Sequence, residues 1–292
     1  MTLLFSHNGV AHEIELRPDL APNTLAKLLA SLPARLDIHC AKIAGQHIFW
    51  HAPFVAELES SIDIMTLPAG TFLYWPERQF LELIYGELQA EKASVSVLGQ
   101  LKGDLGWLKE LGRNLVLSHG REITWASLDF APGSHAVPAP EAAVEHPGLR
   151  ALHSARKAAW AEEPADVQRL LARRGMMLPF GPLAMAEGEL RKAHELLWRL
   201  WNGSSGLPAE QVPGVACFLL QAFIDRVDGF CAMHETGTVL HLIIDLLRDT
   251  SAPLTRVLEE AVLYTGRMAA WLDLYIAWND CNEQTLALRS AS

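Results

Sequence analysis

The sequence predicts an α+β fold in which an N-terminal β-barrel is followed by an all-α helical bundle. Three observations predict it. Residues 1–130 are short apolar runs separated by turn residues, 131–148 are rich in Pro and Ala, and 149–292 carry long helical periods. A chain of 292 residues is long enough for two domains that each bury a core. We expect a barrel domain at 1–130, a linker at 131–148 and a helical domain at 149–292.

The barrel half shows hairpin, strand and helix signals in turn. Asn8-Gly9 between two strand-like runs indicates a tight hairpin. A helix that Asn23 or Thr24 caps is expected to close one barrel end, and a second helix is expected to stop at Gly112. The strand candidates are 35–44, 46–51, 71–75, 80–85 and 122–128, with a turn at Pro76-Glu77-Arg78 joining the third and fourth of these.

The second half is expected to be a bundle of five or six helices. Helical apolar periods cover about 187–201, 214–229, 238–248 and 254–279, with turns at GSSGLP and SAP between some of them.

Composition narrows the class of protein. The formal net charge is −10 without clustered basic residues, so neither nucleic acid nor a membrane surface is an expected partner. No apolar run is long enough to span a bilayer, and Met1–Val10 lacks the features of a signal peptide, so we expect a cytoplasmic protein. The four cysteines have no paired spacing and are expected to be reduced thiols. A homo-oligomer is compatible with the sequence.

Motifs for common cofactors are absent from the sequence. It contains no nucleotide-binding glycine loop, no G-x-S-x-G elbow and no H-E-x-x-H pair. We therefore expect no cofactor and no metal site.

Glu82 is the most informative acidic residue of the barrel half. In a strand over 80–85 it shares a face with Phe80 and Ile84, so a carboxylate interrupts an otherwise apolar strand. It is either solvated or paired with a lysine, or it is an acid or base whose pKa a partly dry cleft raises.

Other candidates are a histidine, aromatic residues and charged helix positions. His51 follows a strand that ends at Trp50, and it is either structural or a proton shuttle. Tyr74 and Trp75 are either packing aromatics or ligands. Charges around Arg226 in the helical half indicate ordinary helix-face pairing, or charged groups that enter a cleft toward the barrel.

Four segments carry a family resemblance. IFWHAPF at 48–54, PAGTFLYWP at 68–76, FLELIYG at 80–86 and LGRNLVLSHGREITW at 111–125 resemble bacterial cyclophilin-like proteins of the small barrel type, over about 1–130. With its helical half, the whole chain resembles the family of cucumopine synthase and its mikimopine-forming relatives. A peptidyl-prolyl isomerase is not implied, because that family's catalytic arginine and its aromatic signature are not found here.

The resemblance implies a Pictet–Spengler condensation of L-histidine with a 2-oxo acid such as 2-oxoglutarate, without a cofactor. The partners would then be two small molecules, an amino acid and a 2-oxo acid. The alternatives are a cyclophilin-like module that binds a small molecule or peptide without turnover, and a purely structural or assembly protein.

Roles for individual residues follow from side-chain chemistry and not from the resemblance. Glu82 is the expected base, with His51 or Tyr74 as the acid. The expected substrate-binding residues are Lys42, Arg78 and Arg226 for carboxylates and Trp50 or Tyr85 for stacking on imidazole.

Overall fold

The computed structural model describes residues 1–42, 44–89, 93–133, 146–173 and 181–290. The chain divides into two compact units, one of Met1–Pro140 with Ala277–Ser292 and one of Glu141–Ile276. The first unit therefore takes in the C-terminal segment, which the sequence analysis assigned to the helical domain. Most of the expected linker, 134–145, lies outside the described residues.

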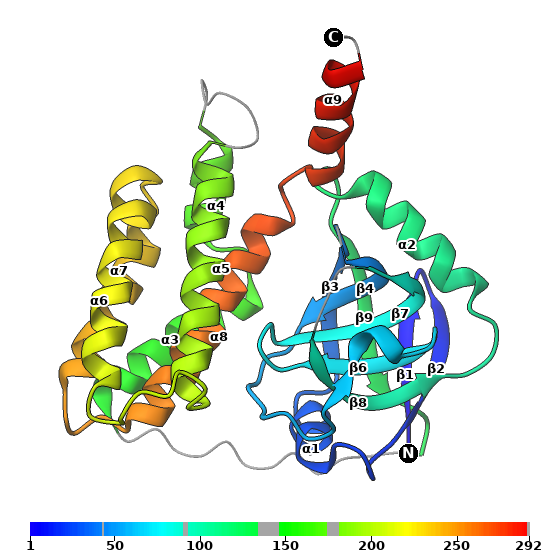
Figure 1. Ribbon diagram of the computed structural model, residues 1–292, viewed down its shortest axis with the longest axis horizontal. Helices are drawn as coiled ribbons and strands as arrows, with labels where there is room; N and C mark the ends of the chain where they lie inside the picture. The colour runs from blue at the N-terminus through cyan, green and yellow to red at the C-terminus, as the bar shows by residue number, and fades with distance from the viewer. Residues whose placement is uncertain (43, 90–92, 134–145, 174–180, 291–292) are drawn as a thin grey trace. The chain divides into compact units, whose positions relative to one another are not determined.

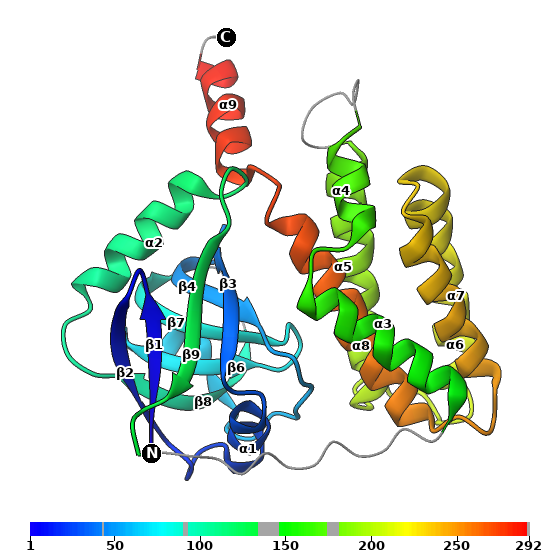
Figure 2. The ribbon, with the colours of Figure 1, turned by 180° about the vertical axis from the view of Figure 1, so that it is seen from behind.

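The first unit is a closed antiparallel barrel of eight strands (Figure 1). The strands pair in the order β2-β1-β9-β3-β4-β7-β6-β8, and a pairing of β8 with β2 closes the barrel. Figure 2 shows β1, β9 and β3 side by side. The strand bounds are β1 Thr2–His7, β2 Val10–Leu16, β3 Ala34–Cys40, β4 Gly45–His51, β6 Thr71–Trp75, β7 Phe80–Leu88, β8 Ser94–Leu101 and β9 Thr124–Phe130, with a two-residue β5 at Ile62–Asp63 beside β8.

Local turn chemistry explains two of the hairpins. Asn8 and Gly9 both have positive φ, 50° and 78°, which is the geometry that a two-residue hairpin requires. The predicted turn between β6 and β7 is confirmed, and Gln79, with φ 48°, closes it by donating its side-chain amide to the Pro76 carbonyl at 2.7 Å. Strand β8 was not predicted.

Two helices, α1 (Pro22–Ala30) and α2 (Gly106–Ser118), lie at opposite ends of the barrel (Figure 1). Their apolar faces join the barrel core, in which Leu25 and Leu28 of α1 and Leu111 of α2 are buried. The inward-facing side chains of the eight strands fill the barrel interior, and the two helices extend this core at its ends.

The cap of α1 differs from the expected one. The helix begins at Pro22, so neither Asn23 nor Thr24 is the N-cap residue. The Glu59 carboxylate instead caps the first turn of the helix, because it accepts the backbone N–H of Asn23 at 3.0 Å and that of Thr24 at 2.7 Å. A cap contributed by a residue so distant in sequence leaves no local signal.

Gly112 does not end α2, as the sequence analysis expected, but lies inside the helix. A Cβ at this position would meet the Tyr85 ring at 2.3 Å. The glycine is therefore a packing feature, since only a residue without a side chain lets Tyr85 lie against the helix.

The second unit is a helical bundle. Its described elements are α3 (Pro147–Ala161), α4 (Ala165–Leu171), α5 (Pro182–Trp201), α6 (Val212–Ile224) with a π-helical turn at Asp225–Phe230, α7 (His234–Arg248) and α8 (Leu254–Asp273). Helix α8 is buried along most of its length. Its Glu260 carboxylate is held by His153 at 2.8 Å and Arg156 at 2.6 Å, both from α3.

The helix expected over 254–279 is in fact two helices. It ends at Asp273, and α9 (Trp278–Ser290) begins after a turn. The backbone of Ala277 lies so close to Gly120 that a Cβ on Gly120 would meet it at 2.5 Å, and Asp280 pairs with Arg121 at 2.7 Å. These contacts attach the segment to the barrel unit, which a continuous apolar period cannot reveal.

Among the helices that the structure describes, none has both the length and the apolar character needed to cross a membrane.

A substitution at Gly112 tests the packing of α2. Gly to Ala in an exposed helix interior stabilises by up to about 1 kcal/mol, but Gly112→Ala should lower the free energy of unfolding by about 1–3 kcal/mol because Tyr85 must move. Gly188→Ala in α5 is the matched control, since nothing lies within 4 Å of its Cβ. Denaturant unfolding measures both, and equal stabilisation by both substitutions would contradict the packing account.

Candidate functional site

The structure brings Glu82 into a row of side chains on the outer face of the barrel. In the strand register, His39 lies opposite Phe49, and Phe49 opposite Glu82. The neighbouring residues in these strands, such as Ile48 and Leu81, belong to the barrel core, so the row must face outward. Six buried or half-buried side chains of β3, β4 and β7 make up a surface that we call the outer patch. They are His39, His47, Phe49, His51, Phe80 and Glu82.

Aromatic contacts hold the outer patch together. The ring of Phe49 stacks on Phe80, with centroids 4.1 Å apart, and on His39, at 5.0 Å. His51 meets Phe80 edge-on at 4.8 Å and His39 at 5.3 Å. Such contacts fix ring orientation, so the imidazoles are positioned before any ligand binds.

Glu82 and His47 form the central polar pair. Their closest side-chain atoms, Glu82 Oε2 and His47 Nε2, are 3.8 Å apart, which is beyond hydrogen-bond distance. Burial lowers the pKa of His47 to about 4, so its imidazole is neutral at pH 7 despite the nearby carboxylate. Desolvation thus outweighs the attraction between the pair.

A second carboxylate borders the patch. Asp37, two residues before His39 in β3, approaches His39 with Oδ2 3.5 Å from Nε2. The ring of His119, which follows α2, lies with its centroid 6.3 Å from that of His39. The outer face therefore combines carboxylates with imidazoles, which are the usual donors and acceptors of protons in enzymes.

The predicted site residues fall into five places. Glu82 and His51 share the outer patch. Arg78 lies in the turn that begins β7, with its guanidinium 5.5 Å from the Trp75 ring centroid, and Trp75 in turn meets Phe80 edge-on at 6.3 Å. Arg226 belongs to the helical unit.

Tyr74 and Trp50 face the barrel core and so lie on the opposite side of the sheet from Glu82. The Tyr74 oxygen accepts the Ala56 N–H at 3.2 Å, and burial raises the pKa of its phenol. Trp50 packs on Phe5 and Phe72. The structure therefore does not bring either side chain to the outer patch.

Lys42 and Tyr85 meet at the barrel end that α2 covers, where both line a cavity of about 640 Å³. Lys42 also approaches the ring of Trp278, with Nζ 5.6 Å from its centroid. This cavity is lined by β-strand ends and α2, and the residues of the outer patch do not line it.

Sequence reasoning missed His39, His47, Phe49 and the role of Phe80. The signal was available, because His47, Phe49 and His51 alternate along β4 as Phe80 and Glu82 do along β7. What the sequence lacks is the pairing of β3 with β4 and of β4 with β7, which brings the alternating sets together.

The patch contains histidines and a carboxylate, yet it is not arranged as a metal centre. Within the described part of the chain, no three side chains of His, Cys, Asp or Glu are placed so that they could hold a metal ion.

Comparison with known proteins shows the fold. No family model matches the chain, and no curated protein does. A solved structure of McbB in complex with tryptophan matches with a TM-score of 0.73 and 19% identity, covering 97% of this chain and 99% of that one. A hypothetical protein from Archaeoglobus fulgidus matches 45% of this chain and 95% of its own, with 19% identity and a TM-score of 0.35. The chain thus shares the fold of McbB over nearly its whole length.

Acid stability tests the burial of His47. The pKa of His47 is about 4 in the folded chain and near 6.5 in the unfolded chain. As the pH falls from about 6.5 to 4, His47 is therefore protonated in the unfolded chain while it stays neutral in the folded one. The free energy of unfolding should therefore fall by up to about 3 kcal/mol over this pH range because of His47. Thermal melts of His47→Gln should show a shallower decline than the wild type. Parallel declines would mean that His47 is solvated.

Proposed function

We propose that the protein condenses an aromatic amino acid with a 2-oxo acid in a Pictet–Spengler reaction at the outer patch. The observation that carries the proposal is Glu82, a carboxylate buried beside the neutral His47 and within a cluster of oriented imidazole and phenyl rings. The fold shared with McbB, a protein that binds tryptophan, supports it. Tryptophan carries the two groups that this reaction needs, an amine and a nucleophilic ring.

The chemistry determines what the patch must do. The amine adds to the ketone, the carbinolamine loses water to give an iminium ion, and the aromatic carbon closes the ring before losing its proton. One water leaves per product, and no electrons are exchanged. The protein must accept a proton from the amine and from the ring carbon, donate one to the departing hydroxyl, and hold both substrates together.

Within this proposal, Glu82 accepts the protons and His51 donates one to the leaving water. Both are held on rigid strands, and His51 is oriented by edge contact with Phe80 and His39. Arg78, in the turn between β6 and β7 and beside Trp75, suits a substrate carboxylate. The substrate pair that we propose is L-histidine with 2-oxoglutarate, as the sequence resemblance implies.

Mass spectrometry of the purified protein tests the proposal. Incubation with L-histidine and 2-oxoglutarate, and separately with L-tryptophan and the same acid, should give a product whose mass is the sum of the substrates less one water. An incubation without protein gives the spontaneous rate, and N-acetylhistidine, which lacks the free amine, should give no product. Thermal stabilisation by a substrate without any product would instead favour a binding module.

Substitution of Glu82 separates catalysis from folding. Glu82→Gln keeps the shape but cannot accept a proton, so it should lower kcat by about 10²-fold or more with little change in Tm. Glu87→Gln is the matched control, because Glu87 lies exposed on the same strand. Full activity in Glu82→Gln would remove this carboxylate from the reaction, and a variant that unfolds would make it a structural group.

A further inference from the structure

The cavity at the α2 end of the barrel gathers positive charge in an acidic protein. Three of its lining side chains are cationic, Lys42 from the loop after β3 and Lys109 and Arg113 from α2. Among the described residues that line it, none is acidic. The chain as a whole carries 34 Asp and Glu against 24 Lys and Arg. Positive side chains that line one cavity favour an anionic ligand over a neutral one of the same shape.

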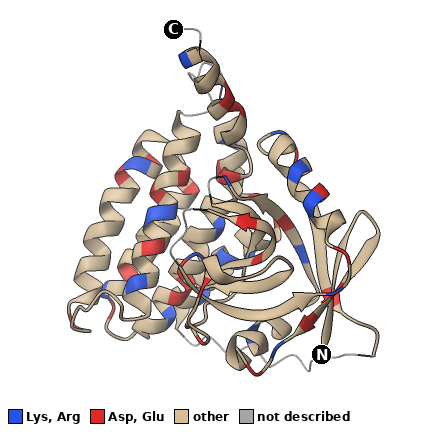
Figure 3. Ribbon diagram, turned by 45° about the vertical axis from the view of Figure 1, so that its right-hand side comes forward, with Lys and Arg blue, Asp and Glu red and all other residues tan. Residues whose placement is uncertain are grey.

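The positions of these cations are set by ordered structure. Lys109 and Arg113 are one helical turn apart and so share a face of α2. The Arg113 guanidinium also donates to the Lys109 carbonyl at 3.4 Å, which aligns it along the helix. Figure 3 shows basic bands on this helix.

The rest of the lining is apolar or neutral. Tyr85, Val116 and Leu117 provide apolar surface, and Gln46 adds an amide. The Gln46 side chain lies over Gly86, where a Cβ would meet its Oε1 directly. A space of about 640 Å³ is within the usual range of small-molecule sites, about 300–1,000 Å³.

The position of the Tyr85 ring at the cavity depends on a glycine inside α2. Gly112 lies in the interior of α2, and its missing Cβ is what lets the Tyr85 ring approach. Burial raises the pKa of Tyr85, so its hydroxyl stays protonated and can donate a hydrogen bond.

We propose that this cavity is a second ligand site, separate from the outer patch, for a small organic carboxylate with an apolar body. Arg113, Lys109 and Lys42 bind the carboxylate, and the apolar body lies against Tyr85 and Val116. Glu82 and Tyr85 point to opposite faces of β7, so the site is independent of the function proposed for the outer patch.

A probe that cannot undergo condensation measures binding without turnover, and variants then assign the binding to one site. 3-Phenylpropionate has a carboxylate and an apolar ring but no ketone, and 3-phenylpropanamide has the same shape without the charge. Calorimetric titration of the full chain should show the carboxylate binding at least tenfold more tightly than the amide, with the difference shrinking at high salt.

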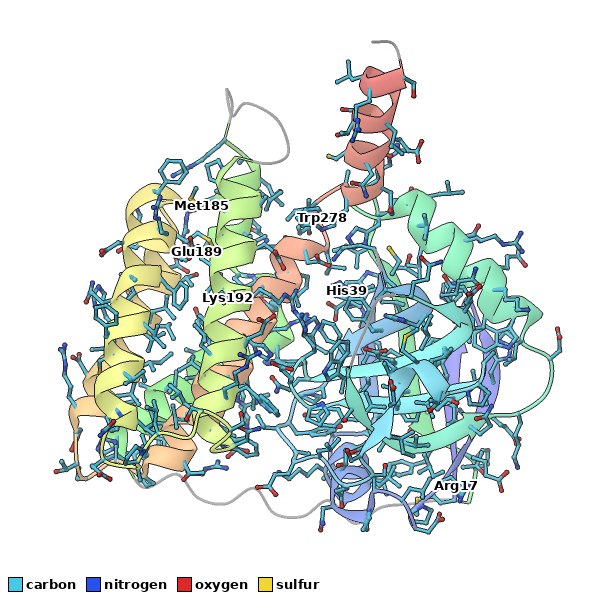
Figure 4. The ribbon with its side chains drawn as sticks, viewed as in Figure 1. Arg17, His39, Met185, Glu189, Lys192 and Trp278 are labelled. Atoms are coloured by element: carbon cyan, nitrogen blue, oxygen red, sulfur yellow. The ribbon has the colours of Figure 1, made fainter. Side chains whose placement is uncertain are left out.

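Variants locate the binding. Lys109→Gln with Arg113→Gln should weaken carboxylate binding at least tenfold, whereas Arg17→Gln should not, because Arg17 lies at the opposite end of the barrel (Figure 4). Arg78→Gln should also leave binding unchanged, which separates this site from the outer patch. Equal affinity for acid and amide, no measurable binding of the acid, or loss only in Arg78→Gln would overturn the proposal. Each outcome is independent of whether the protein condenses substrates.

Discussion

The two-residue period of the β-strand is the constraint on which this barrel depends. Each strand sends alternate side chains inward and outward, and closure of the eight strands makes every inward residue part of one core. In β7, Leu81, Leu83 and Tyr85 therefore fill the interior while Phe80, Glu82 and Ile84 face out. A carboxylate can occupy β7 because it is on the outer side, where the barrel core does not require an apolar group.

The same period gives the outer patch its chemistry. Neighbouring strands align outward residues in rows, so one histidine from β3, one phenylalanine from β4 and one glutamate from β7 come into register. Packing of the rings then fixes the imidazoles, and burial keeps His47 neutral. A neutral base beside a carboxylate is useful for reactions that move protons without changing oxidation state, and this is the reaction class that we propose.

The sequence predicted the fold class, the β6–β7 turn, the Asn8-Gly9 hairpin and the strand face that Glu82 shares with Phe80 and Ile84, because each follows from local pattern. It did not predict the partners of Glu82, since these depend on strand register. Tyr74 and Trp50 were expected near the site, but their own alternation sends them into the core. Gly112 was predicted to end a helix because the residue that requires a glycine there, Tyr85, is distant in sequence.

A crystal structure of the protein soaked with L-histidine or L-tryptophan tests most directly whether the outer patch holds the amino acid. We expect the ligand against the outward faces of β3, β4 and β7, with its amine within hydrogen-bond distance of the Glu82 carboxylate and its ring stacked on one of the patch rings. Amino acid bound only in the cavity beneath α2, with the surroundings of Glu82 and His47 unchanged, would contradict it.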